Sequence, residues 1–498
     1  MIIRQGFLNF KVFLLTLIFS ILLFSFSDAQ VNDFQHIRTE VHFDEILREW
    51  DGFGVNYVEE AQARNYPVDR QEYGGFHLLN ENARQEIIEM IFGEDGLKPA
   101  LVKMFLDPWH QSEPNGSFNH NWTTEQMRYF ARKGLEVTRE RGEDLQFITT
   151  LYGPPAYMTK QKVIRGRDFD YQYKDHFADY VINWIEFLRN EEGLPVNYFS
   201  LHNEGEDWQR WPQDGGDNES HYNHDYNLYW SPEQITDFLK FLPQKFKEAG
   251  LDDLGITPGE PFSWDRFSDF GIAKAIADDP IALENLDLIT SHGFHSFGWG
   301  RWNTYHTNRA NNIIQQKRPD LHSWVTSTSW TDMGVDFIRE LYGNIYHSGV
   351  NAIIPWAVVQ RPGLWIGGDP NAGCAFHVFD DGTYKVRKGY YFYKQVTRAG
   401  QPGTGIAYTV SMDPQVKLIG FASNGSDHPN AFVVLNRSND DKDLQIRVSG
   451  TDYDTFNAYR SKDDESELYD ELETFTLKSD VLYYTAPKKS VTTFYQIK

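Results

Sequence analysis

The sequence is poor in cysteine and in positive charge. Cys374 is the only cysteine among 498 residues, which excludes an intrachain disulfide and a metal site built from cysteines. The 47 Lys and Arg residues stand against 71 Asp and Glu residues, a formal net charge of −24. Because binding to nucleic acid or to an anionic membrane surface needs clustered positive charge, we expect neither partner. A neutral substrate that is recognised locally fits this charge better.

The N-terminal apolar run is too short for a membrane span. This run, Val12–Phe26, has fewer than the roughly 20 residues that a spanning helix needs. Two basic residues precede it, and the small residues Ser27 and Ala29 follow it at the positions that a signal peptidase reads. We therefore interpret residues 1–29 as an export signal cleaved near Ala29. We expect the mature protein in the periplasm or outside the cell, without a membrane anchor.

From residue 50 onward, short apolar runs alternate with longer stretches of helical period. Continuous apolarity, rather than strict alternation, indicates parallel strands that are covered on both faces. Eight such strands with helices between them predict a (β/α)8 TIM barrel over residues 50–399. The runs are Gly52–Asn56, Leu101–Asp107, Leu145–Tyr152, Val196–Glu204, Leu254–Glu260, Leu286–Phe294, His322–Trp330 and Asn351–Val359.

After about residue 400 the apolar runs are separated by clusters of Asn, Asp, Gly and Ser. This pattern predicts an antiparallel β-sandwich over residues 400–498, and residues 30–49 are expected to add a strand to it. No Gly-rich phosphate loop is present. The pairs His292 with His295 and His221 with His224 lack a recognised metal-ligand spacing. We therefore expect a protein without a metal or cofactor, and we expect a monomer.

Polar and aromatic residues close the predicted barrel strands, at the end where barrels carry their active sites. Sugars stack their C–H faces on aromatic rings, and their hydroxyls need planar hydrogen-bond partners. A ring of Trp, acids and amides therefore indicates a sugar-binding site. The residues concerned are Asp107, Trp109, His110, Tyr157, Asn203, Glu204, Glu260, Trp264, His292, His295, Trp330 and Trp356.

Several motifs resemble the family 30 glycoside hydrolases, which belong to a large clan of retaining enzymes built on (β/α)8 barrels. The resemblance covers nearly the whole mature chain, including the side domain. Its motifs are, in chain order, Asp51–Gly54, Gly153–Met158, Leu201–Glu204, Gly259–Trp264, Ser291–Phe294, Arg387–Tyr393, Arg398 and Pro402-Gly403.

The resemblance implies an enzyme that cleaves β-glycosidic bonds in a polysaccharide or its oligosaccharides. It makes Glu204 the general acid/base and Asn203 the partner of the sugar 2-hydroxyl. We expect burial beside Trp208 to raise the pKa of Glu204, so that the acid stays protonated in the resting enzyme. Further substrate contacts are expected from Trp109, His292, Trp264, Trp330 and Trp356.

The family places its nucleophile, a Glu, at the end of strand seven, where this sequence has no carboxylate. The run Ser323–Trp330 puts Ser327 in that position, or Thr328 if the register slips by one residue. Phe294 stands where the family tends to have a Tyr that binds the nucleophile. The retaining mechanism needs a carboxylate about 5–5.5 Å from the acid.

The missing carboxylate on strand seven has three possible explanations. Another acid, Glu260, Asp107 or Asp332, serves as a base about 6.5–9.5 Å from Glu204, which would make the enzyme inverting. Alternatively, the protein binds glycans without cutting them, or Ser327 is a laboratory substitution. A Ser327 nucleophile activated by a histidine is conceivable, but no third, orienting group is evident.

Overall fold

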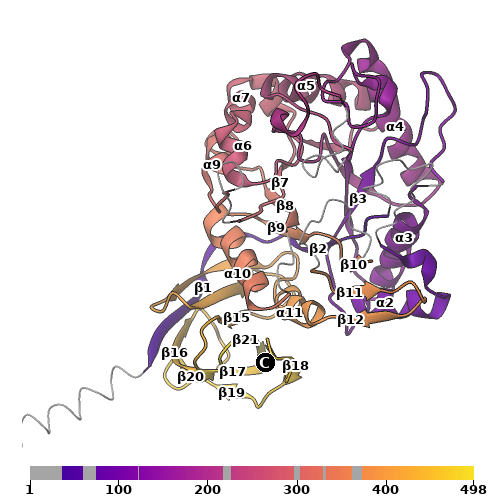
Figure 1. Ribbon diagram of the computed structural model, residues 1–498. Helices are drawn as coiled ribbons and strands as arrows, with labels where there is room; N and C mark the ends of the chain where they lie inside the picture. Colours follow the sequence, from indigo (N-terminus) through magenta and orange to yellow (C-terminus); the bar gives the residue numbers. More distant parts are fainter. Residues whose placement is uncertain are drawn as a thin grey trace, which may run out of the picture.

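The computed structural model describes residues 36–59, 74–121, 123–216, 226–296, 303–328, 333–361 and 373–497, and it shows a barrel above a β-sheet domain (Figure 1). Eight strands form one sheet in the order β6-β5-β4-β3-β2-β9-β8-β7, and the neighbours are parallel. The predicted (β/α)8 barrel is therefore confirmed. The strands are β2 (Gly52–Asn56), β3 (Leu101–Leu106), β4 (Gln146–Leu151), β5 (Val196–Ser200), β6 (Gly255–Thr257), β7 (Ile289–Ser291), β8 (Ser323–Thr328) and β9 (Ala352–Pro355).

Helices cover the outside of the barrel. In α5 (Pro232–Glu248), the Ser231 hydroxyl accepts a hydrogen bond from Gln234 N, which caps the helix, and Pro232 occupies its first turn. None of the helices in the described part of the chain is long and apolar enough to cross a membrane. The other helices are α2 (Glu81–Phe92), α3 (Glu125–Glu140), α4 (Lys174–Asn190), α6 (Trp264–Asp269), α7 (Ile272–Asp278), α8 (Pro280–Glu284), α9 (Arg309–Gln315), α10 (Val335–Gly343) and α11 (Lys388–Thr397).

The barrel lumen changes from apolar to polar along the strands. Its lower layer is a cluster that includes Leu101, Ile148 and Trp324. Two residues further along β3 and β4, on the same strand faces, stand Lys103 and Thr150, and both contact Glu260. Barrel interiors are usually filled by branched apolar side chains. The polar second layer therefore forms the floor of the site that lies above it.

The C-terminal strands form a sheet that folds over on itself. Its order is β18-β17-β21-β15-β14-β13-β1-β16-β20, with β19 paired to β17. One apolar cluster joins strands from both halves and includes Phe43, Phe432, Phe456 and Phe494. The strands are β13 (Gly405–Ser411), β14 (Val416–Ala422), β15 (Ala431–Asn436), β16 (Lys442–Ser449), β17 (Thr455–Lys462), β18 (Leu468–Glu471), β19 (Phe475–Thr476), β20 (Val481–Ala486) and β21 (Ser490–Ile497).

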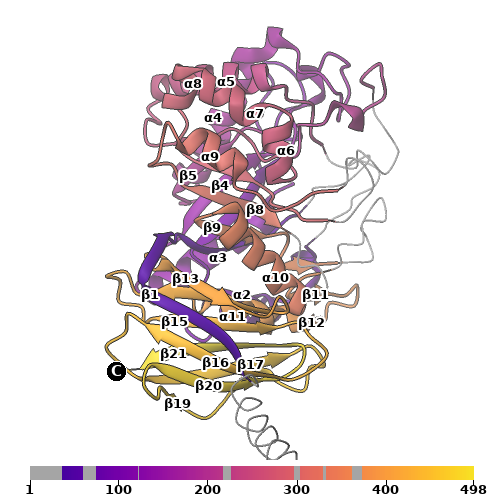
Figure 2. The same cartoon turned by 90° about the vertical axis from the view of Figure 1, so that its left-hand side faces the viewer.

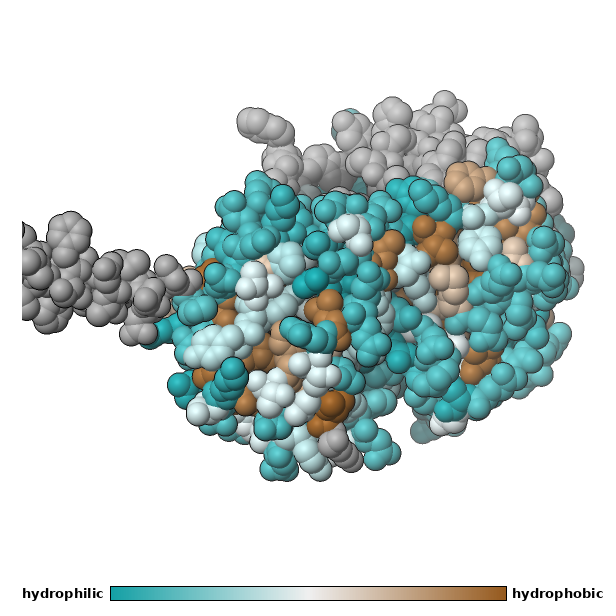
Figure 3. All heavy atoms as spheres, turned by 90° about the horizontal axis from the view of Figure 1, so that it is seen from below, coloured by the Kyte–Doolittle hydropathy of each residue, from teal (hydrophilic) through white to brown (hydrophobic). Residues whose placement is uncertain are grey.

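The N-terminal strand β1 (Ile37–Glu49) belongs to this second sheet. It pairs antiparallel with β13 and parallel with β16, so it lies among strands from the far end of the sequence (Figure 2). The predicted domain boundaries at residues 49 and 399 stay proposals, which this pairing supports. Seen from below, the surface is mostly hydrophilic, with apolar side chains scattered between polar ones (Figure 3).

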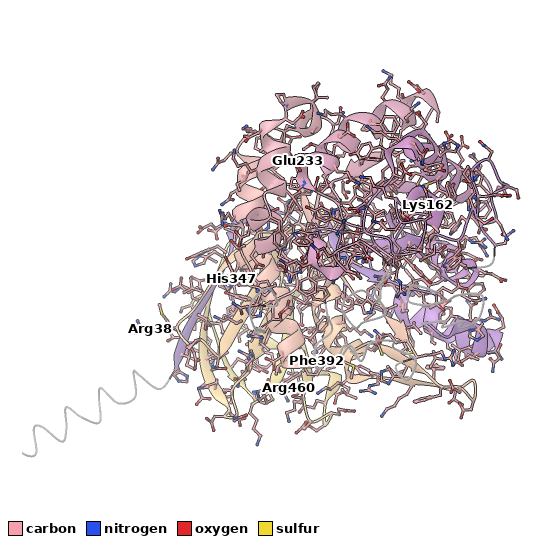
Figure 4. The ribbon with its side chains drawn as sticks, turned by 45° about the horizontal axis from the view of Figure 1, so that its top comes forward. Arg38, Lys162, Glu233, His347, Phe392 and Arg460 are labelled. Atoms are coloured by element: carbon pink, nitrogen blue, oxygen red, sulfur yellow. The ribbon has the colours of Figure 1, made fainter. Side chains whose placement is uncertain are left out.

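Aromatic packing joins the barrel to the sandwich. Trp50, directly before β2, is 0% exposed, and its indole N–H donates to Gly400 O at 2.9 Å. Its ring packs against Phe53 of the barrel and Phe421 of the sandwich, with centroids 4.8 and 5.8 Å away. Phe392 of α11 also lies at this junction (Figure 4). The two units thus share part of one core.

Replacing Trp50 should therefore destabilise both units together. We expect Trp50→Ala to lower the free energy of unfolding by about 3–5 kcal/mol, because it removes a buried ring and leaves a cavity. Urea denaturation followed by fluorescence and circular dichroism would measure this. Tyr453→Ala, at a side chain that is 44% exposed, is the matched control. A Trp50→Ala loss no larger than that of the control would contradict a shared core.

Candidate active site

Glu204 sits at the end of the fourth barrel strand in a strained backbone conformation. Asn203 forms a bridge with Glu260 beyond β6, and Glu204 N donates to Glu260 O at 2.9 Å. The φ angle of Glu204 is +43°, in the left-handed region that a non-glycine residue adopts at a cost of about 1–3 kcal/mol. Two side chains hold this turn, since Asn227 Nδ2 donates to Asn203 O at 2.8 Å and Arg210 Nη1 donates to Glu204 O at 3.1 Å. The neighbouring structure therefore fixes the position of the carboxylate.

The Glu204 carboxylate is ionised and held by two basic side chains. The Glu204 side chain is 11% exposed, and Arg210 Nη2 donates to its Oε2 at 2.6 Å. His292 Nδ1 lies 2.8 Å from its Oε1. Burial alone would raise the pKa of Glu204, but the positive charges of Arg210 and His292 outweigh this and hold the pKa well below its usual range.

The expectation of a raised pKa for Glu204 is therefore wrong. It depended on Trp208 burying the carboxylate, but Trp208 is 48% exposed. The short 3-10 helix η5 (Trp208–Arg210) turns Trp208 outward and brings Arg210 back onto Glu204. The order of residues in the chain gave no indication of which of the two would face the acid.

His292, after β7, lies between two carboxylates. Its Nδ1 faces Glu204, and its Nε2 lies 3.1 Å from Glu260 Oε2. A ring nitrogen that faces a carboxylate carries a proton, so the contacts on both sides favour the imidazolium form. Burial lowers the pKa of His292, but the hydrogen bonds to Glu204 and Glu260 outweigh it and leave the pKa raised. The site therefore keeps a proton directly next to Glu204.

Glu260 lies in the lumen below His292. Its side chain is 0% exposed, and it forms an ion pair with Lys103 of β3. Thr150 Oγ1 donates to Glu260 Oε1 at 2.6 Å. Burial would raise the pKa of Glu260, but Lys103 and His292 lower it to about 2. With both oxygens engaged and no exposure, Glu260 is placed to anchor His292 rather than to reach a substrate.

The other acids that were considered as a base are placed differently. Asp107 is 4% exposed, accepts from Trp109 N at 2.9 Å and lies 3.3 Å from His110 Nε2. It therefore fixes the loop after β3. Asp332 and the predicted substrate contact Trp330 lie outside the described residues.

A β-bulge in β8 decides which residue of strand seven faces the lumen. Val325 pairs with Ile353 and Thr328 pairs with Pro355, so three residues of β8 advance against two of β9. Such a bulge shifts the alternation of side chains by one residue. Thr328 Oγ1 contacts Glu340 Oε1 of α10 at 3.4 Å, outside the barrel. Its neighbour Ser327 therefore takes the lumen side, and its match to the family's nucleophile position stays a prediction.

Glu340 is a buried acid that the sequence analysis missed. Its side chain is 3% exposed, its Oε1 accepts from His295 N at 2.9 Å, and His306 Nε2 lies 3.4 Å from the same oxygen. It stands on a helix that covers the outside of β8. Nothing in the helical pattern around it indicated a buried carboxylate. Its position behind the strand gives it a structural role for the loops after β7 and β8.

Aromatic rings line one side of the barrel mouth. The rings of Trp356, Phe105, Tyr152, Tyr226 and Trp109 follow one another with centroids 6.1, 5.0, 5.6 and 6.2 Å apart. Trp356 is 6% exposed and Trp109 is half-buried, so a substrate can reach the end of the row at Trp109.

Two further predicted contacts differ in their availability. Trp264 is 1% exposed and donates its indole N–H to Asn344 Oδ1 at 3.0 Å, which places it in the core. Asn203 is 3% exposed, and its Oδ1 has no hydrogen-bond partner in the described part of the chain. This orphaned acceptor is suited to a sugar hydroxyl. The residues that the structure describes contain no group of three His, Cys, Asp or Glu side chains that could hold a metal ion.

Comparison with solved structures identifies the architecture. The catalytic domain of the glycoside hydrolase family 30 xylanase C from Talaromyces cellulolyticus superposes with a TM-score of 0.67 at 16% identity, covering 93% of this chain and 100% of that one. The chain has the family 30 fold. An endo-β1,6-glucanase matches with a TM-score of 0.65 at 16% identity, covering 93% and 94% of the two chains.

A conserved exported protein from Bacteroides fragilis also matches, with a TM-score of 0.65, 13% identity and coverage of 92% and 99% of the two chains. No family model matches the sequence, and no curated protein does. At these identities the solved structures show the fold, and the chemistry has to be argued from the residues of the site.

The buried ion pair below the site should make stability depend on pH. The pKa of Glu260 is about 2, against about 4.3 in an unfolded chain. Because the folded state binds fewer protons, the ion pair stabilises the protein above about pH 5, and this contribution is lost as the pH falls towards 2. We expect Lys103→Met to lower the free energy of unfolding at pH 7 by about 3–5 kcal/mol, since it takes from the fully buried Glu260 one of its two positive partners.

The double variant Lys103→Met/Glu260→Gln should recover part of this loss and depend less on pH between 5 and 2. Urea unfolding at a series of pH values would measure both effects. Lys245→Met is the control, because the pair of Lys245 with Asp175 is open to solvent, which screens its charges and leaves little effect on stability. If Lys103→Met cost no more than Lys245→Met, the ion pair would not support the site.

Proposed function

We propose that the protein is an exported glycoside hydrolase that cleaves β-glycosidic bonds in a polysaccharide or its oligosaccharides, with Glu204 as general acid/base. The observation that carries this proposal is the pairing of Glu204 with a protonated His292, 2.8 Å away, at a strand end of the family 30 fold. The names of the xylanase and the glucanase support the substrate class. The N-terminal apolar run and the exported neighbour support export.

Glu204 and His292 share the proton that the reaction needs. A glycosidic oxygen leaves readily only when it is protonated as its bond breaks. A carboxylate offers about four acceptor positions, so Glu204 can accept from Arg210 and His292 and still face a leaving oxygen. A proton that moves from His292 Nδ1 to Glu204 Oε1 passes to that oxygen, while His292 keeps its contact with Glu260. The orphaned Asn203 Oδ1 accepts a hydrogen bond from the sugar 2-hydroxyl.

The resemblance to family 30 puts the attacking group at position 327, where this chain has a serine. Ser327 faces the lumen, and Glu260 and Asp107 are engaged elsewhere. A carboxylate at position 327 would also place negative charge in the lumen near Glu204. Such charge raises the pKa of a neighbouring acid and so favours its protonated form.

The first test is whether the protein cuts glycans and whether Glu204 is required. Purified protein would be incubated with xylan, β-1,6-glucan, galactan and algal polysaccharides, and new reducing ends would be counted. We expect Glu204→Gln to lower kcat/KM on the accepted glycan by about 10²- to 10⁴-fold, because the leaving oxygen loses its proton donor. Substrates whose leaving group needs no proton should be affected less.

Glu233→Gln provides the matched control for this test. Glu233 lies in the first turn of α5 and is exposed (Figure 4), so the same chemical change there should leave turnover intact. Unchanged turnover in Glu204→Gln would refute the acid. Binding of a glycan without any new reducing ends would favour a protein that recognises glycans without cutting them.

The second test adds a carboxylate at strand seven. We expect Ser327→Glu to raise turnover, because the bulge directs this side chain into the lumen and the new charge favours a protonated Glu204. Phe294→Tyr in addition should orient the new carboxylate. Thr328→Glu is the control, because residue 328 points at Glu340 and a second acid there would be repelled without reaching the lumen. A folded Ser327→Glu variant with lower turnover would show that another base is in use.

A further inference from the structure

Trp208 is the most exposed tryptophan in the described part of the chain. It is 48% exposed, while Trp109 is half-buried. An indole ring is among the largest apolar groups that a fold can bury. A ring left in solvent therefore gives up much of the apolar surface burial that would stabilise the fold. The remaining described tryptophans are at most 6% exposed, namely Trp50, Trp184, Trp211, Trp230, Trp264, Trp324 and Trp356.

The turn that carries Trp208 is bound to Glu204, the proposed general acid. Asp207 Oδ1 accepts from Gln209 N at 3.1 Å at the start of η5. At its end, Arg210 binds both the carboxylate and the main-chain oxygen of Glu204, at 2.6 and 3.1 Å. The exposed ring is therefore held at a set place, four residues from Glu204, and would lose little conformational entropy on binding a ligand.

The geometry points to a binding site for the leaving-group sugar, with Trp208 as its stacking platform. This inference rests on the function proposed above. The sugar that is attacked must occupy the lumen, where Ser327 and the orphaned Asn203 Oδ1 lie. Glu204 marks the glycosidic oxygen, so the sugar beyond it lies at the rim of the mouth. Its C–H face can stack on the indole there, as sugars do on aromatic rings.

This placement narrows the substrate class. An aromatic ring on the leaving-group side adds to substrate binding only when the leaving group is itself a sugar that can stack on it. The protein should therefore prefer linkages between sugars, as in a polysaccharide chain or its oligomers, over glycosides with small aglycones. It should also bind the chain on both sides of the bond that is cut.

The test compares two substrates of the same sugar on Trp208→Ala. One is an oligosaccharide with a sugar leaving group, and the other is the corresponding glycosyl fluoride, whose fluoride occupies no sugar site. We expect kcat/KM for the oligosaccharide to fall about tenfold, the equivalent of one aromatic stacking contact, and the value for the fluoride to stay unchanged. Trp208→Phe should keep most of the activity on the oligosaccharide. Phe270→Ala, at a ring that is 41% exposed at the end of α6, is the control and should change neither value.

The outcomes separate this inference from the proposed function. An equal loss on both substrates, or no loss on either, would overturn the platform while leaving hydrolysis established. If the parent protein cuts no glycan, the proposed function fails, and the platform is tested by calorimetric binding of the same oligosaccharides to the parent and to Trp208→Ala. Weaker binding by the variant would support the platform. Equal binding, or none by either protein, would overturn it.

Discussion

The ion pair between Lys103 and Glu260 is the base of a row of alternating charges that ends at Glu204 and Arg210. Lys103 is positive, Glu260 negative, His292 positive, Glu204 negative and Arg210 positive, and each contacts the next. Buried charges are tolerated only when each has a partner of opposite sign, because removal from water is costly. The alternation from the lumen floor to the mouth satisfies this for all five side chains. His292 is held as an imidazolium because an anion lies on each side of it.

The barrel accommodates this row of charges by separating its layers. Below it, Trp324, Ile148 and their neighbours close the lumen with apolar side chains. Around the charges, Thr150 donates to Glu260, and Thr290 Oγ1 donates to Gly259 O at 2.8 Å. Short hydroxyl side chains supply these hydrogen bonds without filling the space that Lys103 and Glu260 need. Two backbone hydrogen bonds between the ends of β5 and β6 help to hold Glu204 in its strained conformation. Glu204 N donates to Glu260 O, and Glu260 N donates to His202 O.

The sequence predicted the parts of this arrangement that depend on one strand at a time. Eight apolar runs became the barrel strands, and Asn203 and Glu204 followed the fourth of them, because apolar continuity and strand ends are local properties. The resemblance added the acid/base role of Glu204, which is part of the proposed function.

The features that the sequence analysis got wrong or missed depend on contacts between strands or on the conformation of the turn after Glu204. Trp208 and Arg210 lie two residues apart in one turn, and only the conformation of η5 decides which of them meets Glu204. The sequence did not reveal that both nitrogens of His292 face carboxylates from other strands, and its predicted contact with substrate stays a prediction. Thr328 and Ser327 could be told apart only by the bulge in β8. For His292 and for Ser327, neighbours distant in the chain fix the charge or the direction of the side chain.

Storing the proton on His292 has a consequence for the timing of catalysis. In the resting site the positive charges keep Glu204 ionised, so the carboxylate itself holds no proton to donate. In the proposed hydrolysis, a bound glycan would exclude water from the mouth, and a breaking glycosidic bond would build negative charge on its oxygen within reach of Glu204. That charge would draw the proton from His292 through Glu204 as the bond breaks. The acid would thereby form in response to the reacting oxygen, while the pairing with Arg210 keeps Glu204 ionised beforehand.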